Sequence, residues 1–210
     1  MYTLHKEILT SEQVELLPAI KHFSKGFGLV GGTAVALQIG HRESVDFDLF
    51  PKELGAEFDV SALKRSFSKK ALIGEIFKAK EGEFTFVTKT GVKVTFFDFE
   101  YAIPYTVPLE RWIMMPDLLT LAAMKAFALG YRAKWKDYVD LFFIIRDHHP
   151  LPKIITRTNE LFGAHFNEKL LRQQLSFFDD VSYKEEIIFK PGFAVSDDEI
   201  KKTLMELGLA

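Results

Sequence analysis

Hydrophobic residues follow two different periods along the chain, and the change falls near its middle. In the first half, short apolar or alternating runs bounded by Gly or Pro predict strands over 27–30, 45–50, 72–80, 84–89 and 92–99. A capping box, Thr10 with Gln13, predicts the first helix. Two further helices are expected, one that begins at Thr33 and ends at Gly40, and one capped by Asp59. This half should therefore mix sheet and helix.

From Pro116 onward the hydrophobic period is helical. It predicts helices over 118–129, 135–146, 154–162 and 167–178, and a capping box at Ser196 predicts a terminal helix. The fold class predicted is α+β, with a mixed sheet flanked by helices and a helical C-terminal region. The two halves should meet near Pro104–Pro108, which divides the chain into residues 1–107 and residues 108–210.

Composition narrows the classes of function. With 210 residues, 48% hydrophobic and 27% charged, the chain can build a core, which excludes disorder as its main description. A net charge of −2 argues against a surface that binds polyanions everywhere. The absence of Cys excludes disulfides, Cys-based zinc sites and thiol nucleophiles. Neither a signal peptide nor a membrane-spanning run is visible in this sequence, so we expect a cytoplasmic protein without a membrane partner.

Two interpretations compete for the glycines near residue 30. Gly26 to Gly31 fit the dinucleotide pattern G-x-G-x-x-G, and Asp46 follows Gly26 by 20 residues. That pattern needs a strand before its first glycine, however, and 21–25 is polar. The stronger interpretation begins at Gly31-Gly32, between a short strand and a new helix. There the backbone can approach a phosphate, and Thr33 can add a hydroxyl.

Two aspartates on the following strand are candidate metal ligands. Asp46 and Asp48 are two apart and should project from one face, while Val45, Phe47 and Leu49 should face the core. Neighbouring carboxylates repel unless a cation lies between them, and Mg²⁺ or Mn²⁺ bound together with nucleotide phosphates would remove that repulsion. Two such ions would activate an attacking oxygen and stabilise a leaving pyrophosphate. A solvated strand end is the alternative for this pair.

These motifs together resemble one family. The first block runs from Gly31 to Leu37 and from Gly40 to Phe50. The second comprises Asp117-Leu118, Ala123-Met124-Lys125, Arg132, Lys136-Asp137 and Asp140-Leu141. In order and spacing they resemble the nucleotidyltransferase family of AbiEii/AbiGii-type toxins, within the DNA polymerase β-like superfamily. The resemblance implies a small mixed sheet flanked by helices, with the GG and DxD motifs in residues 1–107 and a Lys/Asp motif in the helical residues 108–210.

The resemblance also implies an activity, the transfer of a nucleoside monophosphate from an NTP to an acceptor hydroxyl of RNA, such as tRNA, or of protein. Some relatives are toxins, so an antitoxin would be a partner. Gly31, Gly32 and Thr33 would hold phosphates, with Arg42 and Ser44 beside them. Asp46 and Asp48 would bind Mg²⁺ or Mn²⁺.

The second block has a functional and a structural interpretation. In the first, Lys125 reaches the triphosphate, Asp137 or Asp140 acts as acid/base or orienting group, and Arg132 and Lys136 neutralise developing charge. In the second, the block is a lattice of surface ion pairs, with Lys136 one helical turn from Asp140.

The sequence differs from the superfamily at the position of the third carboxylate, and this difference leaves two hypotheses for the function. Thr95 stands where a third carboxylate is expected, and a hydroxyl is a poor general base or metal ligand. Asp98 has the opposite parity on that strand and should point to the other face. The protein is then either an active metal-dependent nucleotidyltransferase or a degenerate module that binds a nucleotide or a partner without turnover.

Overall fold

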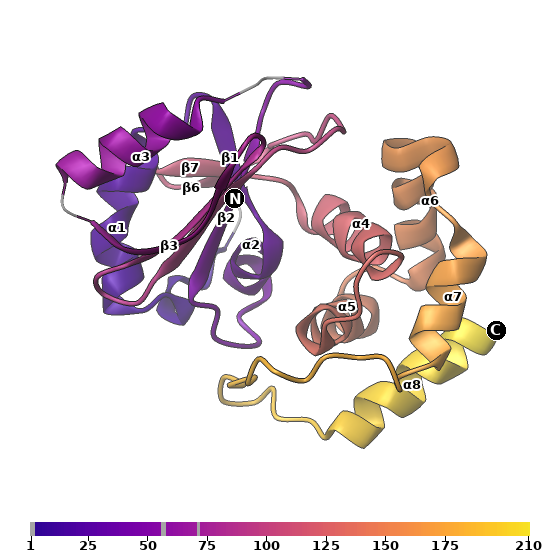
Figure 1. The fold of residues 1–210 in the computed structure, drawn as a ribbon. Coiled ribbons are helices and arrows are strands. Elements are labelled where there is room, and N and C mark those ends of the chain that lie inside the picture. Colours follow the sequence, from indigo (N-terminus) through magenta and orange to yellow (C-terminus); the bar gives the residue numbers. More distant parts are fainter. Residues whose placement is uncertain (1–2, 56–57, 71) are drawn as a thin grey trace.

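A five-stranded mixed sheet forms the first half of the molecule (Figure 1). The computed structural model describes residues 3–55, 58–70 and 72–210. The strand order is β1-β2-β5-β4-β3, with β1 (Phe27–Val30), β2 (Asp46–Pro51), β3 (Ile73–Lys80), β4 (Glu83–Thr88) and β5 (Lys93–Phe97). The 3₁₀ turn η1 (Lys6–Ile8) and the helices α1 (Ser11–Lys21), α2 (Gly31–Ile39) and α3 (Val60–Lys69) complete this half.

Around Asp46 and Asp48 the sheet has one apolar face and one polar face, because side chains alternate along β2 and β5. On β2, Phe47 and Leu49 are buried in the core. Phe96 of β5 belongs to the same core and meets the rings of Phe23, just after α1, and of Phe67 on α3. The strand is shorter than predicted at its start: Val45 precedes β2 and is 48% exposed, so its expected place in the core is wrong. A solvated position suits it because pairing with β5 begins only at the next residue.

In the five-stranded sheet that the described residues form, β2 and β5 are parallel, and the pairs β1–β2, β3–β4 and β4–β5 are antiparallel. This topology contradicts the dinucleotide-binding alternative, which requires a parallel sheet. Gly28 has a local explanation instead, because a Cβ there would overlap the ring of Tyr105. The strands predicted over 72–80 and 84–89 correspond to β3 and β4, which pair as an antiparallel hairpin through Glu81-Gly82.

Helix ends agree closely with the capping signals. Thr10 and Gln13 form the predicted capping box, Asp59 caps α3, and Gly40 ends α2 with φ +79°. The start of α2 is an exception, because the helix begins at Gly31 and not at Thr33. Gly31 itself has φ +72°, a conformation that only glycine adopts at low cost.

A layer of helices forms the second half, as predicted (Figure 1). Its elements are the hairpin β6 (Val107–Leu109) and β7 (Ile113–Met115), helices α4 (Leu118–Leu129), α5 (Trp135–Asp147), α6 (Leu151–Phe162), α7 (Glu168–Ser176) and α8 (Asp197–Leu209), and the 3₁₀ turn η2 (Gly163–His165). The hairpin was not predicted, since strands of three residues carry too little periodic signal. The predicted boundary between residues 107 and 108 falls inside β6.

The chain returns to the first half through residues 177–196, which we call the return segment. It passes below α5 in Figure 1 before α8 begins. Ser182 exchanges backbone hydrogen bonds with Ala133 and Trp135, and Ile188 and Lys190 pair with Glu43 and His41. The two halves are therefore joined by backbone contacts as well as by the linker.

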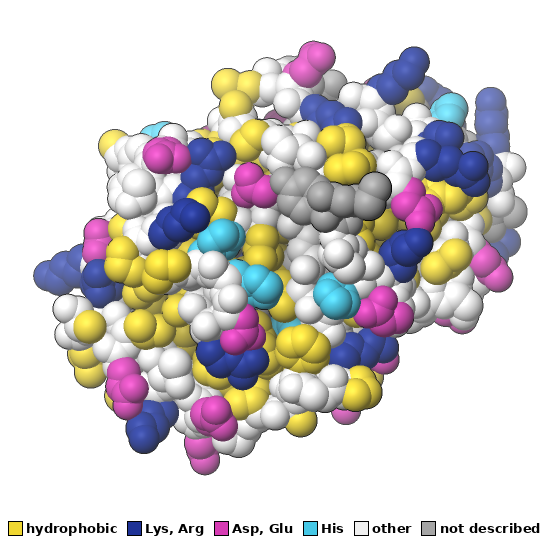
Figure 2. All heavy atoms as spheres, turned by 180° about the vertical axis from the view of Figure 1, so that it is seen from behind, with side chains coloured by type: hydrophobic (Ala, Val, Ile, Leu, Met, Phe, Trp, Pro, Cys, Tyr) yellow, Lys and Arg dark blue, Asp and Glu magenta, His cyan; other side chains and the backbone are white. Residues whose placement is uncertain are grey.

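The surface mixes both signs of charge. Figure 2 shows the face behind that of Figure 1, where basic and acidic side chains are interspersed with hydrophobic ones. The described residues of this face form no continuous basic surface, as the net charge predicts. Within 3–55, 58–70 and 72–210, no helix is both long and apolar enough to cross a membrane.

Candidate active site

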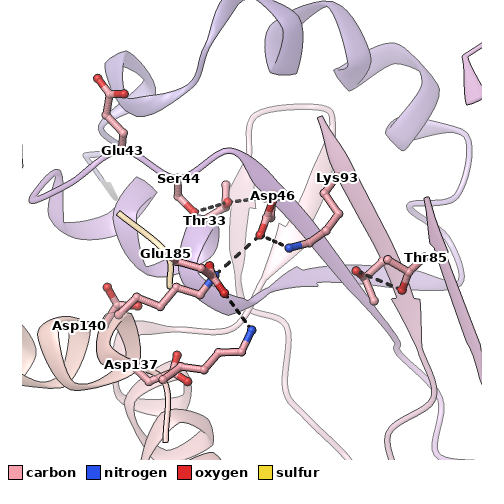
Figure 3. A network of polar contacts seen from close by, with 12 residues as sticks. Thr33, Glu43, Ser44, Asp46, Thr85, Lys93, Asp137, Asp140 and Glu185 are labelled. Carbon is pink, nitrogen blue, oxygen red and sulfur yellow. Dashed lines mark hydrogen bonds and ion pairs between the residues drawn. The ribbon is translucent and has the colours of Figure 1, made fainter. Parts of the chain in front are cut away.

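Asp46 and Asp48 lie on the polar face of the sheet, as their spacing predicts, and both are partly exposed. Lys93, opposite Asp46 on β5, places its ammonium 2.6 Å from the Asp46 carboxylate. Thr33 of α2 hydrogen-bonds the Ser44 hydroxyl at 2.8 Å and donates to the backbone carbonyl of Asp46 (Figure 3). The two hydroxyls thus fix the start of β2 against α2.

The two glycines that begin α2 are needed because charged side chains approach them closely. A Cβ on Gly31 would overlap a carboxylate oxygen of Asp48, and one on Gly32 would lie 2.5 Å from Nη2 of Arg42. Both glycines therefore leave room for side chains of the site, Asp48 at Gly31 and Arg42 at Gly32. That they also hold phosphates stays a prediction.

The environment of Asp48 favours a bound proton or cation. Burial, and then the neighbouring Asp46 carboxylate, raise the pKa of Asp48 above its ordinary value. The paired carboxylates fit a hard divalent cation, because Mg²⁺ is commonly held by one or two carboxylates together with water and phosphate oxygens.

Among the described residues, β5 supplies no third acid to this pair. Thr95 lies directly opposite Asp48 in the β2–β5 register, and its hydroxyl is 3.5 Å from that of Thr85. Asp98 follows β5 and lies beside Gly82 of the β3–β4 turn. In the part of the chain that the structure describes, no group of three His, Asp or Glu side chains is placed to hold a metal ion.

A buried ionic network lies beneath the site and is centred on Asp140. Arg42 donates from Nε and Nη2 to its two carboxylate oxygens at 2.7 and 2.9 Å, and His41 donates from Nε2 at 2.8 Å. Lys125 of α4 lies 2.8 Å from the same carboxylate. Burial alone would raise the pKa of Asp140, but Arg42 and Lys125 hold it well below its usual range. Arg42 therefore turns its charge inward, beneath Gly32.

Asp137 shares Lys125 with Asp140 and is also fully buried. Burial would raise the pKa of Asp137, but the Lys125 ammonium lowers it. Its second oxygen has no hydrogen-bond partner among the described residues and lies 3.4 Å from Nε of Arg132, which is half exposed. The lattice of surface ion pairs is therefore a wrong description of this block: its aspartates and Lys125 are buried.

The spacing suggested that Lys136 pairs with Asp140 one helical turn away, but the two do not pair. The Lys136 ammonium pairs instead with Glu185 of the return segment and lies 3.7 Å from Asp46 (Figure 3). Lys134 holds the other oxygen of Glu185 at 2.9 Å. Burial would raise the pKa of Glu185, but hydrogen bonds from Lys136 and Lys134 lower it to about 2.

Lys93, Lys134 and Glu185 are charged groups of the site that the sequence did not indicate. Strand alternation would have selected Lys93 once the β2–β5 register was known. No local pattern marks Lys134 or Glu185, because they meet only when the return segment crosses the start of α5.

Three known proteins are similar to this chain in sequence or in structure. The chain is 27% identical over 185 residues to an uncharacterized protein, aq_aa25, of Aquifex aeolicus, covering 85% of this chain and 86% of that protein. MenT4, a nucleotidyltransferase toxin of Mycobacterium tuberculosis, superposes with a TM-score of 0.58 at 12% identity, over 93% of this chain and 80% of that one. JHP933 of Helicobacter pylori is 17% identical with a TM-score of 0.49, over 96% and 90%.

The mixed sheet and its flanking helices therefore have the fold of nucleotidyltransferase toxins. Residues 16–206 match the family described as nucleotidyl transferase AbiEii toxin of type IV toxin–antitoxin systems. The chain belongs to this family, which confirms the resemblance inferred from the sequence.

Proposed function

We propose that the protein is a metal-dependent nucleotidyltransferase that moves an NMP from an NTP to a hydroxyl of RNA, such as tRNA, or of protein. We further propose that it acts in the cytoplasm as the toxin of a pair whose antitoxin is a protein. The observation that carries the proposal is the pair Asp46 and Asp48, which share an open sheet face with Lys93 and Lys136 nearby. In the reaction, the acceptor oxygen bonds the α-phosphorus, the bond to pyrophosphate breaks, and the hydroxyl proton passes to water.

Asp46 and Asp48 are the residues that would hold Mg²⁺ or Mn²⁺. The bound ion would supply charge stabilisation and a more reactive acceptor oxygen. The raised pKa of Asp48 supports this role, since a cation removes the repulsion from Asp46.

The surrounding residues divide into two groups by position. Lys93, Arg132 and Lys136 are exposed enough to meet phosphate oxygens. Gly31, Gly32, Thr33 and Ser44 lie around the start of β2, which carries Asp46 and Asp48. Arg42, Lys125, Asp137 and Asp140 are buried and paired with one another, so we assign them as positioning residues. Through Arg42 they would hold the Gly31–Gly32 turn against β2.

A degenerate binding module is the second candidate function. Thr95 opposite Asp48, without a third acid among the described residues nearby, favours it. Such a module would retain the nucleotide and lose turnover.

Label transfer distinguishes the two candidates. The purified protein is incubated with each α-labelled NTP, Mg²⁺ or Mn²⁺, and total tRNA or a protein extract, beside the variant Asp46→Asn/Asp48→Asn. Asp198→Asn, a change at an exposed carboxylate of α8, is the matched control. Label that reaches RNA or protein with the wild type and the control, but not with the double variant, would support the enzyme. Metal-dependent NTP binding without transfer would support the binding module.

The toxin role has its own test. Induced expression should slow bacterial growth, and Asp46→Asn, expressed to the same level, should relieve the effect. Equal toxicity of the two would exclude nucleotidyl transfer as the cause.

A further inference from the structure

The return segment brings a carboxylate into a site made of two lysines. Lys134 contacts one oxygen of Glu185 at 2.9 Å, and Lys136 contacts the other. Lys136 also lies 3.7 Å from Asp46, so this two-lysine site adjoins the carboxylates proposed to hold the metal ion (Figure 3). An anion is thus already bound there, and it comes from the chain itself.

Two ammonium groups that converge on two oxygens also suit a phosphate. Lysine binds phosphate as a point charge, with no need for the planar fork that a carboxylate and an arginine share. Because an NTP held at Asp46 and Asp48 extends its phosphates away from the reacting centre, the neighbouring ammonium groups lie within reach of its charge.

Glu185 is held in a way that permits release. The return segment is anchored by backbone hydrogen bonds at Ser182 on one side and at Ile188 on the other. Between these anchors, the backbone groups of 183–187 make no hydrogen bond to other described backbone groups. Ile187 packs against the core and Tyr183 lies against Trp135, whereas the Glu185 side chain between them is held only by partly exposed ion pairs among the described residues, and such pairs are individually weak.

We propose that Lys134 and Lys136 form a binding site for the triphosphate of the NTP, and that Glu185 occupies this site until the nucleotide displaces it. The proposal rests on the nucleotidyltransferase function proposed above. It gives the return segment a role in regulation, because the same carboxylate that closes the empty site must leave before the phosphates can bind.

The test compares two neighbouring acids. Glu185→Gln removes the competing charge, and Glu186→Gln removes the same charge from an exposed residue with no ion pair among the described residues. Binding of each NTP and of inorganic tripolyphosphate is measured by calorimetry. Glu185→Gln should tighten binding about three- to tenfold over the wild type, as expected when two partly exposed ion pairs no longer compete, and Glu186→Gln should change it less than twofold.

The outcomes separate this inference from the proposed function. Wild-type protein that binds no NTP under any condition would overturn both. NTP binding that Glu185→Gln leaves unchanged or weakens would overturn the competition alone. An equal gain in NTP affinity in Glu185→Gln and Glu186→Gln would mean that net charge alone causes the effect, and it would overturn the competition. If Glu185→Gln tightened the binding of tRNA but not of NTP, Lys134 and Lys136 would bind the acceptor and not the triphosphate. In a Lys134→Gln background the gain from Glu185→Gln should shrink.

A spectroscopic readout follows the loop directly. The Trp135 ring is buried beneath the return segment, with its centroid 5.2 Å from that of Tyr183. In a Trp112→Phe background, NTP should increase quenching of Trp135 fluorescence by acrylamide, and Glu185→Gln should show the increase without NTP. Quenching that NTP does not change would mean that the loop stays closed.

Discussion

At the scale of single residues, the position of Asp48 lowers the stability of the metal-free protein and favours the binding of a cation. Its carboxylate lies against Gly31 and on the same face as Asp46, and both partial burial and that neighbour disfavour its charge. The folded protein therefore binds a proton at Asp48 more tightly than the unfolded chain does, and its stability decreases as pH rises above 3.8 through the raised pKa. Sites that bind ions often carry such a penalty.

We expect Asp48→Asn to stabilise the metal-free protein at neutral pH while it removes metal-dependent nucleotide binding. The amide keeps the shape of the side chain and removes the repulsion, so the melting temperature should rise by about 2–4 °C, which corresponds to about 1 kcal/mol. Thermal melting with and without Mg²⁺ checks this, with Asp198→Asn as control. A lower melting temperature would contradict this account of Asp48.

His41 makes stability depend on mildly acidic pH. Burial, which outweighs the attraction of Asp140, lowers the pKa of His41 below 6.5; Arg42, Lys125 and the Phe143 ring also surround it. As pH falls below 6.5, His41 becomes protonated in the unfolded chain but stays neutral in the folded protein, so stability decreases. Urea unfolding at pH values of about 7.5 and 5.5 should show a decrease that is smaller in His41→Gln. Removal of the exposed His22 by His22→Gln should leave the decrease intact.

At the scale of elements, the connection from β1 to α2 is built around its glycines. Gly31 combines a φ of +72° with the contact to Asp48, whereas Gly192 has a φ of +88° in open space. A substitution at Gly192 would therefore introduce backbone strain alone, whereas the same substitution at Gly31 would also disturb the site. Capping residues fix where α1, α3 and α8 begin, which explains why these helices could be predicted from the sequence.

Gly31→Ala should destabilise the protein more than Gly192→Ala and abolish nucleotide binding. Gly192→Ala adds only strain, about 1 kcal/mol, whereas Gly31→Ala also displaces Asp48. Chemical denaturation and calorimetry with NTP measure the two effects. Nucleotide binding by Gly31→Ala at the wild-type level would show that Asp48 does not need its present position.

At the scale of the whole molecule, the network around Asp140 joins the two halves. Its carboxylate on α5 holds His41 and Arg42 from the loop after α2, and it holds Lys125 from α4. The lowered pKa of Asp140 contributes stability above pH 3.8 that is lost as pH falls toward the folded value. Removing one member leaves buried positive charge without its partner.

Asp140→Asn should therefore cost about 3–5 kcal/mol at neutral pH, and the two halves should then unfold in separate transitions. Asp147→Asn, on the same helix in a half-exposed pair with Arg146, should cost less than about 1 kcal/mol. Circular dichroism and tryptophan fluorescence followed during denaturation test both expectations. A loss of similar size in the two variants would show that burial adds nothing to the role of Asp140.

Most elements, most helix ends, the family and the common face of Asp46 and Asp48 could be predicted from the sequence, because periodicity and caps act within a few residues. The sequence did not reveal that β6 and β7 would pair, that Lys93 would face Asp46, or that Lys125 and Asp140 would be buried. Those features depend on strand register and on contacts between distant segments. Glu185 shows this most clearly: only the path of the return segment brings it to Lys136, since no local pattern encodes a contact across 49 positions.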